Sequence, residues 1–135
     1  MRLRKVTPDG NCLFSAATVC VMCVHDDDIG EDSIRENAQQ LREEVVSFMR
    51  EHKANFEPFM TDNFEDYMCE MEKPHVWGGE RELLAIAKVT DRQVHVYTEN
   101  QGEIVKLVEY GDACARASDA ISLLFSTKHY DALLP

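Results

Sequence analysis

The sequence lacks an apolar run long enough to cross a bilayer, and its basic start, residues 1–5, leads into no signal-peptide core. It also lacks internal repeats, low-complexity tracts and linkers. Its 135 residues are close to the commonest size of one domain, and a hydrophobic content of 44% is enough to fill one core. We therefore expect a single soluble domain over residues 1–135 that carries no targeting segment of its own.

Positive charge is also scarce. Fourteen basic residues stand against twenty-five acidic ones, which gives a formal net charge of −11. A surface of that sign repels phosphate backbones, so the composition argues against a nucleic-acid partner. It attracts basic protein surfaces and speeds the encounter with them. The alternative interpretation is that the charge only keeps a small protein in solution.

Cysteines are few and odd in number: Cys12, Cys20, Cys23, Cys69 and Cys114. An odd count without a secretory signal argues against a disulfide framework and for a reducing compartment, which we expect to be the cytoplasm or nucleus. Cys20 and Cys23 form a Cys-x-x-Cys pair, but a structural zinc site needs a second pair of ligands. We interpret the pair as core packing. A small redox or metal-binding protein built on it is the alternative.

Hydrophobic periodicity predicts helices first and strands afterwards. Helical spacing and buried apolar stretches indicate helices over residues 12–24, 34–51, 64–71 and 80–88. Alternating or continuous apolar residues indicate strands over residues 2–6, 94–97, 103–108 and 121–125. Ser33 and Glu36 have the spacing of a capping box at the start of the second helix. This order predicts an α+β domain with a small, mostly antiparallel sheet.

Cys12 follows a loop of turn-forming residues, 7–11, and opens the first predicted helix. A helix N-terminus stabilises a thiolate, and the preceding loop can point successive amides into one concavity, which suits an oxyanion hole. Gly10 permits this backbone path, while Asp9 and Asn11 can brace the loop. On its own, a cysteine in an apolar helix is more often a small core residue.

His129 and Asp131 stand two residues apart at the other end of the chain, after an apolar run. On a strand they project to the same side, so Asp131 can accept a hydrogen bond from one ring nitrogen of His129. The second nitrogen is then left for a thiol, which is the arrangement of a cysteine hydrolase. Spacing alone does not bring residues 12 and 129 together.

Three blocks of the chain together resemble the ovarian-tumour (OTU) family of cysteine deubiquitinases. Asp-Gly-Asn-Cys-Leu-Phe at residues 9–14 resembles the family's nucleophile motif. Trp-Gly-Gly-Glu at residues 77–80, with the strand 94–97, resembles its central block, and His-Tyr-Asp at residues 129–131 resembles its histidine motif. The blocks follow the family's order and span residues 7–135, so the chain would be one OTU-type catalytic domain.

The resemblance implies a papain-like fold, in which the sheet packs between helices, and a thiol isopeptidase that cleaves after the C-terminal glycine of ubiquitin or polyubiquitin. Cys12 would carry the acyl group, His129 would serve as general base and then acid, and Asp131 would orient His129. Asp9 would brace the oxyanion loop, whose amides come from residues 9–12. No metal, organic cofactor, nucleic acid or membrane is implied, and we expect a monomer.

Several alternatives stay open. Trp77 either staples a helix onto the sheet or walls the histidine side of the cleft. The acidic residues 26–28, Glu31 and Asp32 would contact the basic tail of ubiquitin, or they are only solvated. The same chemistry on another ubiquitin-like modifier, or a catalytically silent ubiquitin-binding module, are the alternative functions.

Overall fold

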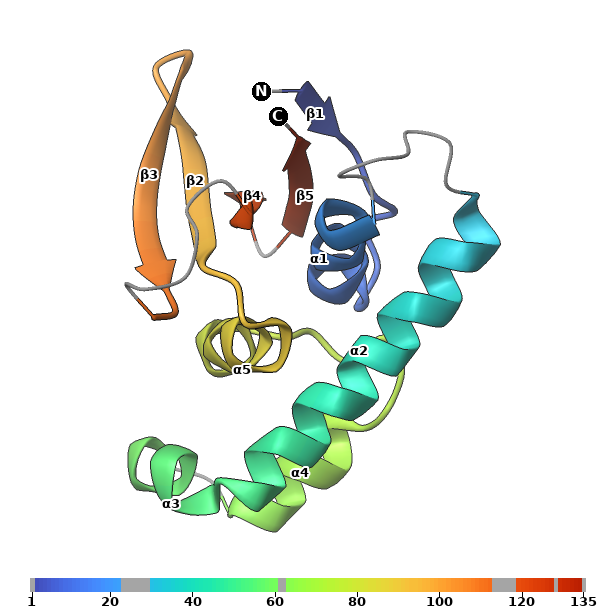
Figure 1. Cartoon of the computed structure of the whole chain (residues 1–135), viewed down its shortest axis with the longest axis vertical. Helices are drawn as coiled ribbons and strands as arrows, with labels where there is room; N and C mark the ends of the chain where they lie inside the picture. Colours follow the sequence, from blue (N-terminus) through green and yellow to red (C-terminus); the bar gives the residue numbers. More distant parts are fainter. Residues whose placement is uncertain (1, 23–29, 61–62, 113–118, 128, 135) are drawn as a thin grey trace.

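The computed structural model describes residues 2–22, 30–60, 63–112, 119–127 and 129–134 (Figure 1). The helices are α1 (Cys12–Met22), α2 (Glu31–Glu51), α3 (Lys53–Phe56), α4 (Phe64–Met71) and α5 (Glu80–Thr90), with a 3-10 turn at Glu57–Phe59. The strands are β1 (Arg2–Arg4), β2 (Val94–Asn100), β3 (Glu103–Tyr110), β4 (Ile121–Ser126) and β5 (His129–Leu134).

The strands form one sheet in the order β1-β5-β4-β2-β3. β2 and β4 run parallel, and the other neighbours pair antiparallel, so the sheet is mixed but mostly antiparallel. This confirms the predicted α+β class. Because β1 pairs with β5, the two ends of the described chain lie side by side (Figure 1).

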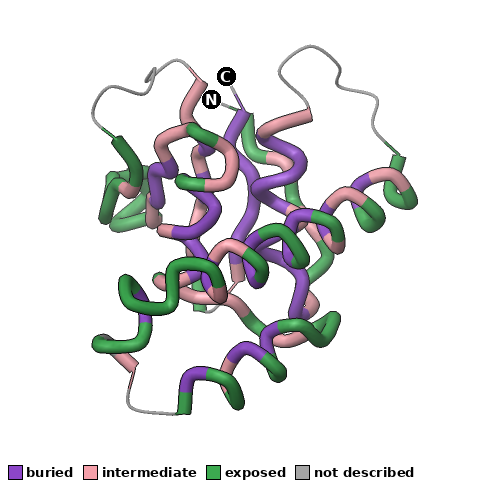
Figure 2. The backbone as a smooth tube through the Cα atoms, turned by 60° about the horizontal axis from the view of Figure 1, so that its bottom comes forward, coloured by how far each residue is buried: buried purple, intermediate pink, exposed green. Residues whose placement is uncertain are grey.

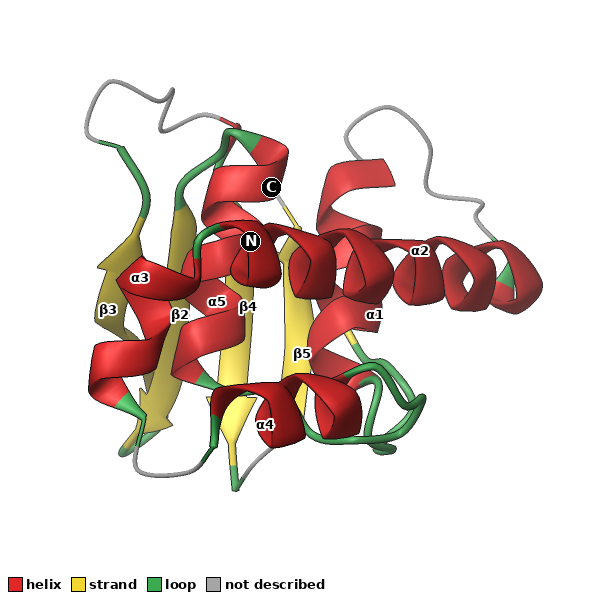
Figure 3. Cartoon of the chain, turned by 90° about the horizontal axis from the view of Figure 1, so that it is seen from below, coloured by secondary structure: helices red, strands yellow, loops and turns green. Residues whose placement is uncertain are grey.

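Alternation along the strands builds the core. One set of alternate residues is at most 5% exposed: Val94 and Val96 of β2, Ile121 and Leu123 of β4, and Ala132 and Leu134 of β5. These strands contact α1 and α5, which supply the facing apolar side chains. Figure 3 shows the described helices gathered in front of the sheet, so the helical layer lies on one side of it. The expected packing of the sheet between helices on both sides is therefore not seen in the described part of the chain. The buried segments meet between the two layers (Figure 2).

The start of α2 differs from the prediction. The helix begins at Glu31 after Gly30, whose N-cap position has no side-chain hydrogen bond, and Ser33 already lies inside the first turn. The capping box predicted for Ser33 and Glu36 is therefore wrong. The carboxylates of Glu31 and Asp32 are stabilised at the positive end of the helix dipole, which explains why the helix begins before the predicted start at residue 34.

Other sequence predictions fall partly on residues outside the described ranges. Residues 26–28, Cys23 and Cys114 are among these. Cys20 is buried on α1, and its thiol donates to the Ser122 carbonyl at 3.3 Å, as core packing requires. The described residues hold no group of three His, Cys, Asp or Glu side chains that could bind a metal. None of the described helices is long and apolar enough to span a membrane.

Candidate active site

Cys12 is the first residue of α1 and is 1% exposed. The loop before it is closed by its own hydrogen bonds. The Asp9 amide donates to the Thr7 carbonyl at 2.8 Å, the Cys12 amide to the Asp9 carbonyl at 3.1 Å, and the Asn11 amide to Oδ1 of Asp9 at 2.9 Å. The Asp9 side chain and carbonyl therefore accept two of the hydrogen bonds that close the loop. The Gly10 amide has no acceptor within the described part of the chain.

Gly10 lies against the backbone of His75. A β-carbon at residue 10 would be 1.5 Å from the His75 carbonyl oxygen, so no other amino acid fits there without a shift of backbone. A second close approach joins the same two regions, because a β-carbon at Gly78 would lie 2.8 Å from Cδ2 of Leu13. The loop before Cys12 and the start of α1 therefore pack closely against the segment around Trp77.

Arg42 of α2 is a functional candidate that sequence reasoning missed. Its side chain is fully buried and reaches the loop from behind. Nε and Nη2 donate to Oδ1 of Asn11 at 3.2 and 2.7 Å, and Nη2 also donates to the Gly10 carbonyl at 3.1 Å and the Val76 carbonyl at 2.8 Å. Nη1 donates to the Met71 carbonyl at 3.0 Å. One guanidinium thus joins three chain segments.

The positive charge of Arg42 interacts electrostatically with two acidic side chains. Burial lowers the pKa of Arg42, and the negative charges of Glu82 and Asp9 oppose that effect. The guanidinium carbon also lies 4.4 Å from the centre of the Phe14 ring. The available sequence signal was an arginine on the apolar face of an amphipathic helix, four residues after Ala38 and three before Val45.

Glu82 is a second buried charged side chain near the loop. Its Oε1 accepts the Gly79 amide and its Oε2 accepts the Tyr67 hydroxyl, both at 2.7 Å. Burial raises the pKa of Glu82 above its ordinary value, and these two hydrogen bonds act in the opposite direction. Glu82 therefore fixes the N-cap of α5 at Gly79, two residues after Trp77.

His129 opens β5, and its Nε2–H donates to Oδ1 of Asp131 at 2.7 Å. The same oxygen accepts the Val6 amide at 2.9 Å, so the strand is tied to the segment that leads to the loop. Among the side chains that the structure describes, Nδ1 of His129 is the buried polar atom without a hydrogen-bond partner. Nε2 is therefore held by Asp131, whereas Nδ1 has no hydrogen-bond partner among the described residues.

The thiol of Cys12 lies against β5. The Tyr130 backbone, between His129 and Asp131, lies close enough to the sulfur to act on the pKa of the thiol. Burial raises the pKa of the Cys12 thiol above its ordinary value, the Tyr130 and Leu13 backbones lower it, and the negative charges of Asp9 and Asp131 raise it. The net direction is upward, so the resting site favours the neutral thiol.

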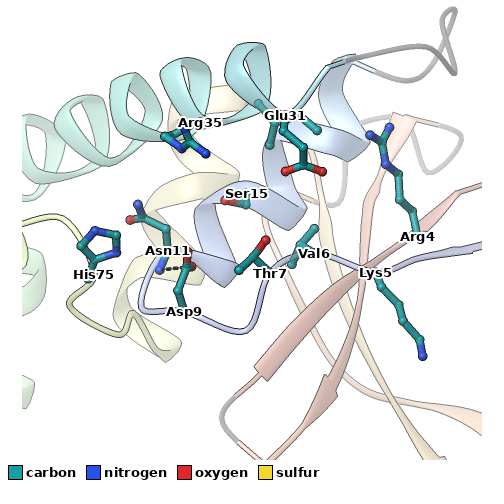
Figure 4. A pocket seen from close by; sticks show the side chains of 11 residues that line it. Arg4, Lys5, Val6, Thr7, Asp9, Asn11, Ser15, Glu31, Arg35 and His75 are labelled. Carbon is teal, nitrogen blue, oxygen red and sulfur yellow. Dashed lines mark hydrogen bonds between the residues drawn. The ribbon is translucent and has the colours of Figure 1, made fainter.

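Trp77 is 44% exposed, which disfavours the interpretation as a packing staple. A polar pocket lies beside the loop and is lined in part by Asp9, Asn11 and His75 (Figure 4). Arg35 of α2 reaches it from the opposite wall. The loop that precedes Cys12 is thus braced by a buried arginine on one side and borders a pocket on another.

Comparison with known proteins gives a consistent family. Residues 7–130 match the family model described as OTU-like cysteine protease. The chain is 32% identical over 130 residues to OVARIAN TUMOR DOMAIN-containing deubiquitinating enzyme 4 of Arabidopsis thaliana, which covers 93% of the chain and 41% of the relative. It is 27% identical over 133 residues to human OTU domain-containing protein 1, covering 95% and 25%. The chain thus spans less than half of the length of either relative.

Solved structures agree on the fold. The OTU domain of OTUD1 superimposes with a TM-score of 0.77 at 23% identity, covering 96% of this chain and 83% of the other. A structure described as an OTU domain in complex with ubiquitin gives 0.67 at 22% identity, covering 96% and 67%. These likenesses show that the fold of this chain is shared with solved OTU domains.

Proposed function

Because this chain belongs to the OTU-like cysteine protease family, we propose that it is a thiol-dependent deubiquitinase that hydrolyses the bond after the C-terminal glycine of ubiquitin. One observation carries the proposal: Cys12, at the start of α1, lies beside the Tyr130 backbone of β5, between His129 and Asp131. His129 gives its Nε2–H to Asp131 and keeps an unpartnered Nδ1, which suits a base for that thiol.

In the proposed reaction, Nδ1 of His129 accepts the Cys12 proton, and the thiolate attacks the carbonyl carbon of the terminal glycine. The tetrahedral intermediate collapses when the imidazolium returns this proton to the leaving lysine amine, which yields a thioester on Cys12 and a free amine. His129 next takes a proton from water, whose oxygen attacks the thioester carbonyl. The C–S bond then breaks, the imidazolium returns its proton to the Cys12 sulfur, and the ubiquitin acid leaves and loses its proton to solvent as the carboxylate. Asp131 holds the ring and stabilises its positive charge.

The oxyanion is assigned to the loop of residues 9–12. Three of its amides are engaged inside the loop at rest, which leaves the Gly10 amide as the donor that no acceptor in the described chain occupies. The site also favours a neutral, covered thiol at rest. We therefore assign the ionisation of Cys12 to the stage at which the substrate enters. We assign Trp77 to the wall of the cleft on the side of His129.

The substrate is assigned from both chemistry and relatives. Relatives named as deubiquitinating enzymes, and an OTU domain solved with ubiquitin, support ubiquitin over other modifiers. The acidic character of the chain, with Glu31 and Asp32 in the first turn of α2, suits the basic tail of ubiquitin. We assign the reaction to a monomer in the cytoplasm, where thiols stay reduced.

The test is incubation with ubiquitin whose C-terminus carries a thiol-reactive electrophile, read by intact mass beside Cys12→Ala. One adduct on the wild type and none on the variant is the expected result. If the wild type reacts only with another ubiquitin-like modifier carrying the same electrophile, the chemistry stands and the substrate was wrong. If no modifier reacts and Cys12 also resists a small alkylating agent, the silent binding module replaces the enzyme.

Serine replacements in the acidic residues test tail recognition separately. Glu31→Ser with Asp32→Ser removes two negative charges from an exposed helix end. Affinity of the Cys12→Ala protein for ubiquitin at low salt should fall, and the difference should shrink as salt rises. Unchanged affinity at low salt would remove these residues from the recognition surface.

A further inference from the structure

We propose that Arg42 is a positioning residue for the proposed reaction: its buried guanidinium fixes the Gly10–Asn11 peptide and so sets the shape of the loop that precedes Cys12. The inference rests on the proposed function and assigns to it a side chain from another element, 31 residues away from Asn11. The hydrogen bonds of Arg42 go to the loop and to the segments behind it. Arg42 acts through the loop.

The Gly10–Asn11 peptide is held at both of its polar atoms. Nη2 of Arg42 donates to the Gly10 carbonyl at 3.1 Å, and the Asn11 amide donates to Oδ1 of Asp9 at 2.9 Å. A peptide plane that is fixed at its oxygen and its N–H does not rotate. The directions of the neighbouring loop amides, including the Gly10 amide that has no acceptor in the described chain, are therefore fixed with it. Loss of Arg42 removes one of these two anchors.

Arg42 also fixes the wall behind the loop. It donates to the carbonyls of Met71, at the end of α4, and Val76, beside Trp77. Gly10 packs directly on that wall through the His75 carbonyl. The loop and its support therefore share one donor, and a displaced guanidinium would move both in the same step.

An arginine is needed because of its shape. Nε and Nη2 converge on Oδ1 of Asn11 while Nη1 reaches the Met71 carbonyl on another segment. A lysine ammonium is a single point and cannot satisfy both positions. Burying a charge is costly, and a purely structural site on α2 is filled as well by an apolar side chain, as at Val45 and Met49. The charge at residue 42 is explained by the carbonyls that it holds.

The test compares Arg42→Lys with Met49→Ala, a truncation of a fully buried side chain on the same helix that takes no part in the hydrogen bonds to the loop. Each is assayed for melting temperature and for kcat and KM on ubiquitin carrying a C-terminal fluorophore. Arg42→Lys should lower kcat by about tenfold to a hundredfold with KM changed by no more than about twofold, because the loop is misplaced while the ubiquitin surface is intact. Met49→Ala should lower the melting temperature at least as much and keep kcat within about twofold of wild type.

A second variant keeps the test decisive if Arg42→Lys does not fold. Asn11→Ala removes the loop's side-chain acceptor and leaves the other Arg42 contacts, and it should also lower kcat more than KM. If Met49→Ala loses kcat in proportion to its loss of melting temperature, the effect of Arg42 is one of stability alone. The same conclusion follows if Arg42→Lys keeps the wild-type kcat. A wild-type protein that does not turn over the substrate overturns the proposed function itself, and this inference with it.

Discussion

Nε2 of His129 lies 2.7 Å from Oδ1 of Asp131, and this one carboxylate oxygen also accepts the Val6 amide at 2.9 Å. A single acceptor atom thus holds the proposed base and the N-terminal segment. An asparagine oxygen in the same place can accept both hydrogen bonds, although it carries no charge to stabilise an imidazolium.

Asp131→Asn is therefore expected to be milder than either His129→Ala or Asp131→Ala. The amide keeps the orientation of His129, so kcat should fall by about tenfold to a hundredfold, whereas His129→Ala removes the base and costs about a thousandfold or more. Steady-state kinetics on ubiquitin with a C-terminal fluorophore gives both values. Equal losses in Asp131→Asn and His129→Ala would show that the charge of Asp131 does more than orient the ring.

Gly10→Ala should damage the loop before Cys12. The added carbon would lie 1.5 Å from the His75 carbonyl oxygen, so backbone has to move at an expected cost of about 1–3 kcal/mol, with a large loss of kcat. Gly30→Ala is the matched control, because an added carbon there meets nothing within 4 Å, and its stability should change by less than about 0.5 kcal/mol. Urea unfolding of both variants makes the comparison. Equal stability of the two would contradict the close approach of Gly10 and His75.

Asp9→Asn should lower the pKa of the Cys12 thiol. The negative charge of Asp9 is one cause of the raised value, and an amide oxygen can still accept the Asn11 amide. Because alkylation requires the thiolate, the rate at Cys12 should reach its half-maximum at a lower pH than in wild type. Iodoacetamide labelling across a pH series, read at the Cys12 peptide by mass spectrometry, gives the midpoint.

The control for this series is Asp66→Asn, which makes the same change of net charge at an exposed position on α4. It should leave the Cys12 midpoint unchanged. A midpoint that moves equally in both variants would trace the effect to net charge, and an upward movement in Asp9→Asn would contradict the electrostatic assignment. In wild type the raised pKa of Cys12 adds stability that is fully present below the unfolded thiol's pKa and is lost as pH rises through the folded value.

Cys20→Ala should reduce stability and leave turnover unchanged. The side chain is 6% exposed and its thiol donates to the Ser122 carbonyl, so truncation should cost about 1–2 kcal/mol. Cys69→Ala is the control at an exposed position and should stay within about 0.5 kcal/mol. Thermal unfolding and kcat are measured for each. A loss of kcat in Cys20→Ala at full stability would revive a chemical role for this cysteine.

Local pattern in the sequence was enough for most elements. The start of α1 at Cys12, the hairpin of β2 and β3, and the side-by-side projection of His129 and Asp131 all depend on residues within a few positions of each other. One local rule that failed was the capping box at Ser33, because the carboxylates of Glu31 and Asp32 make an equally good first helical turn. When two possible helix starts have similar free energies, the spacing of residues in the sequence does not show which one forms.

Only the tertiary structure decided how these pieces act together. The sequence by itself determined most of the helices and strands, and it predicted which side chains on them take part in the chemistry. It did not determine that β2 pairs in parallel with β4, that the Cys12 thiol meets the backbone of Tyr130, or that Arg42 turns inward to hold Gly10 and Asn11. Each of these contacts joins segments far apart in the chain, and the geometry that selects them arises from packing of the whole core rather than from any local period.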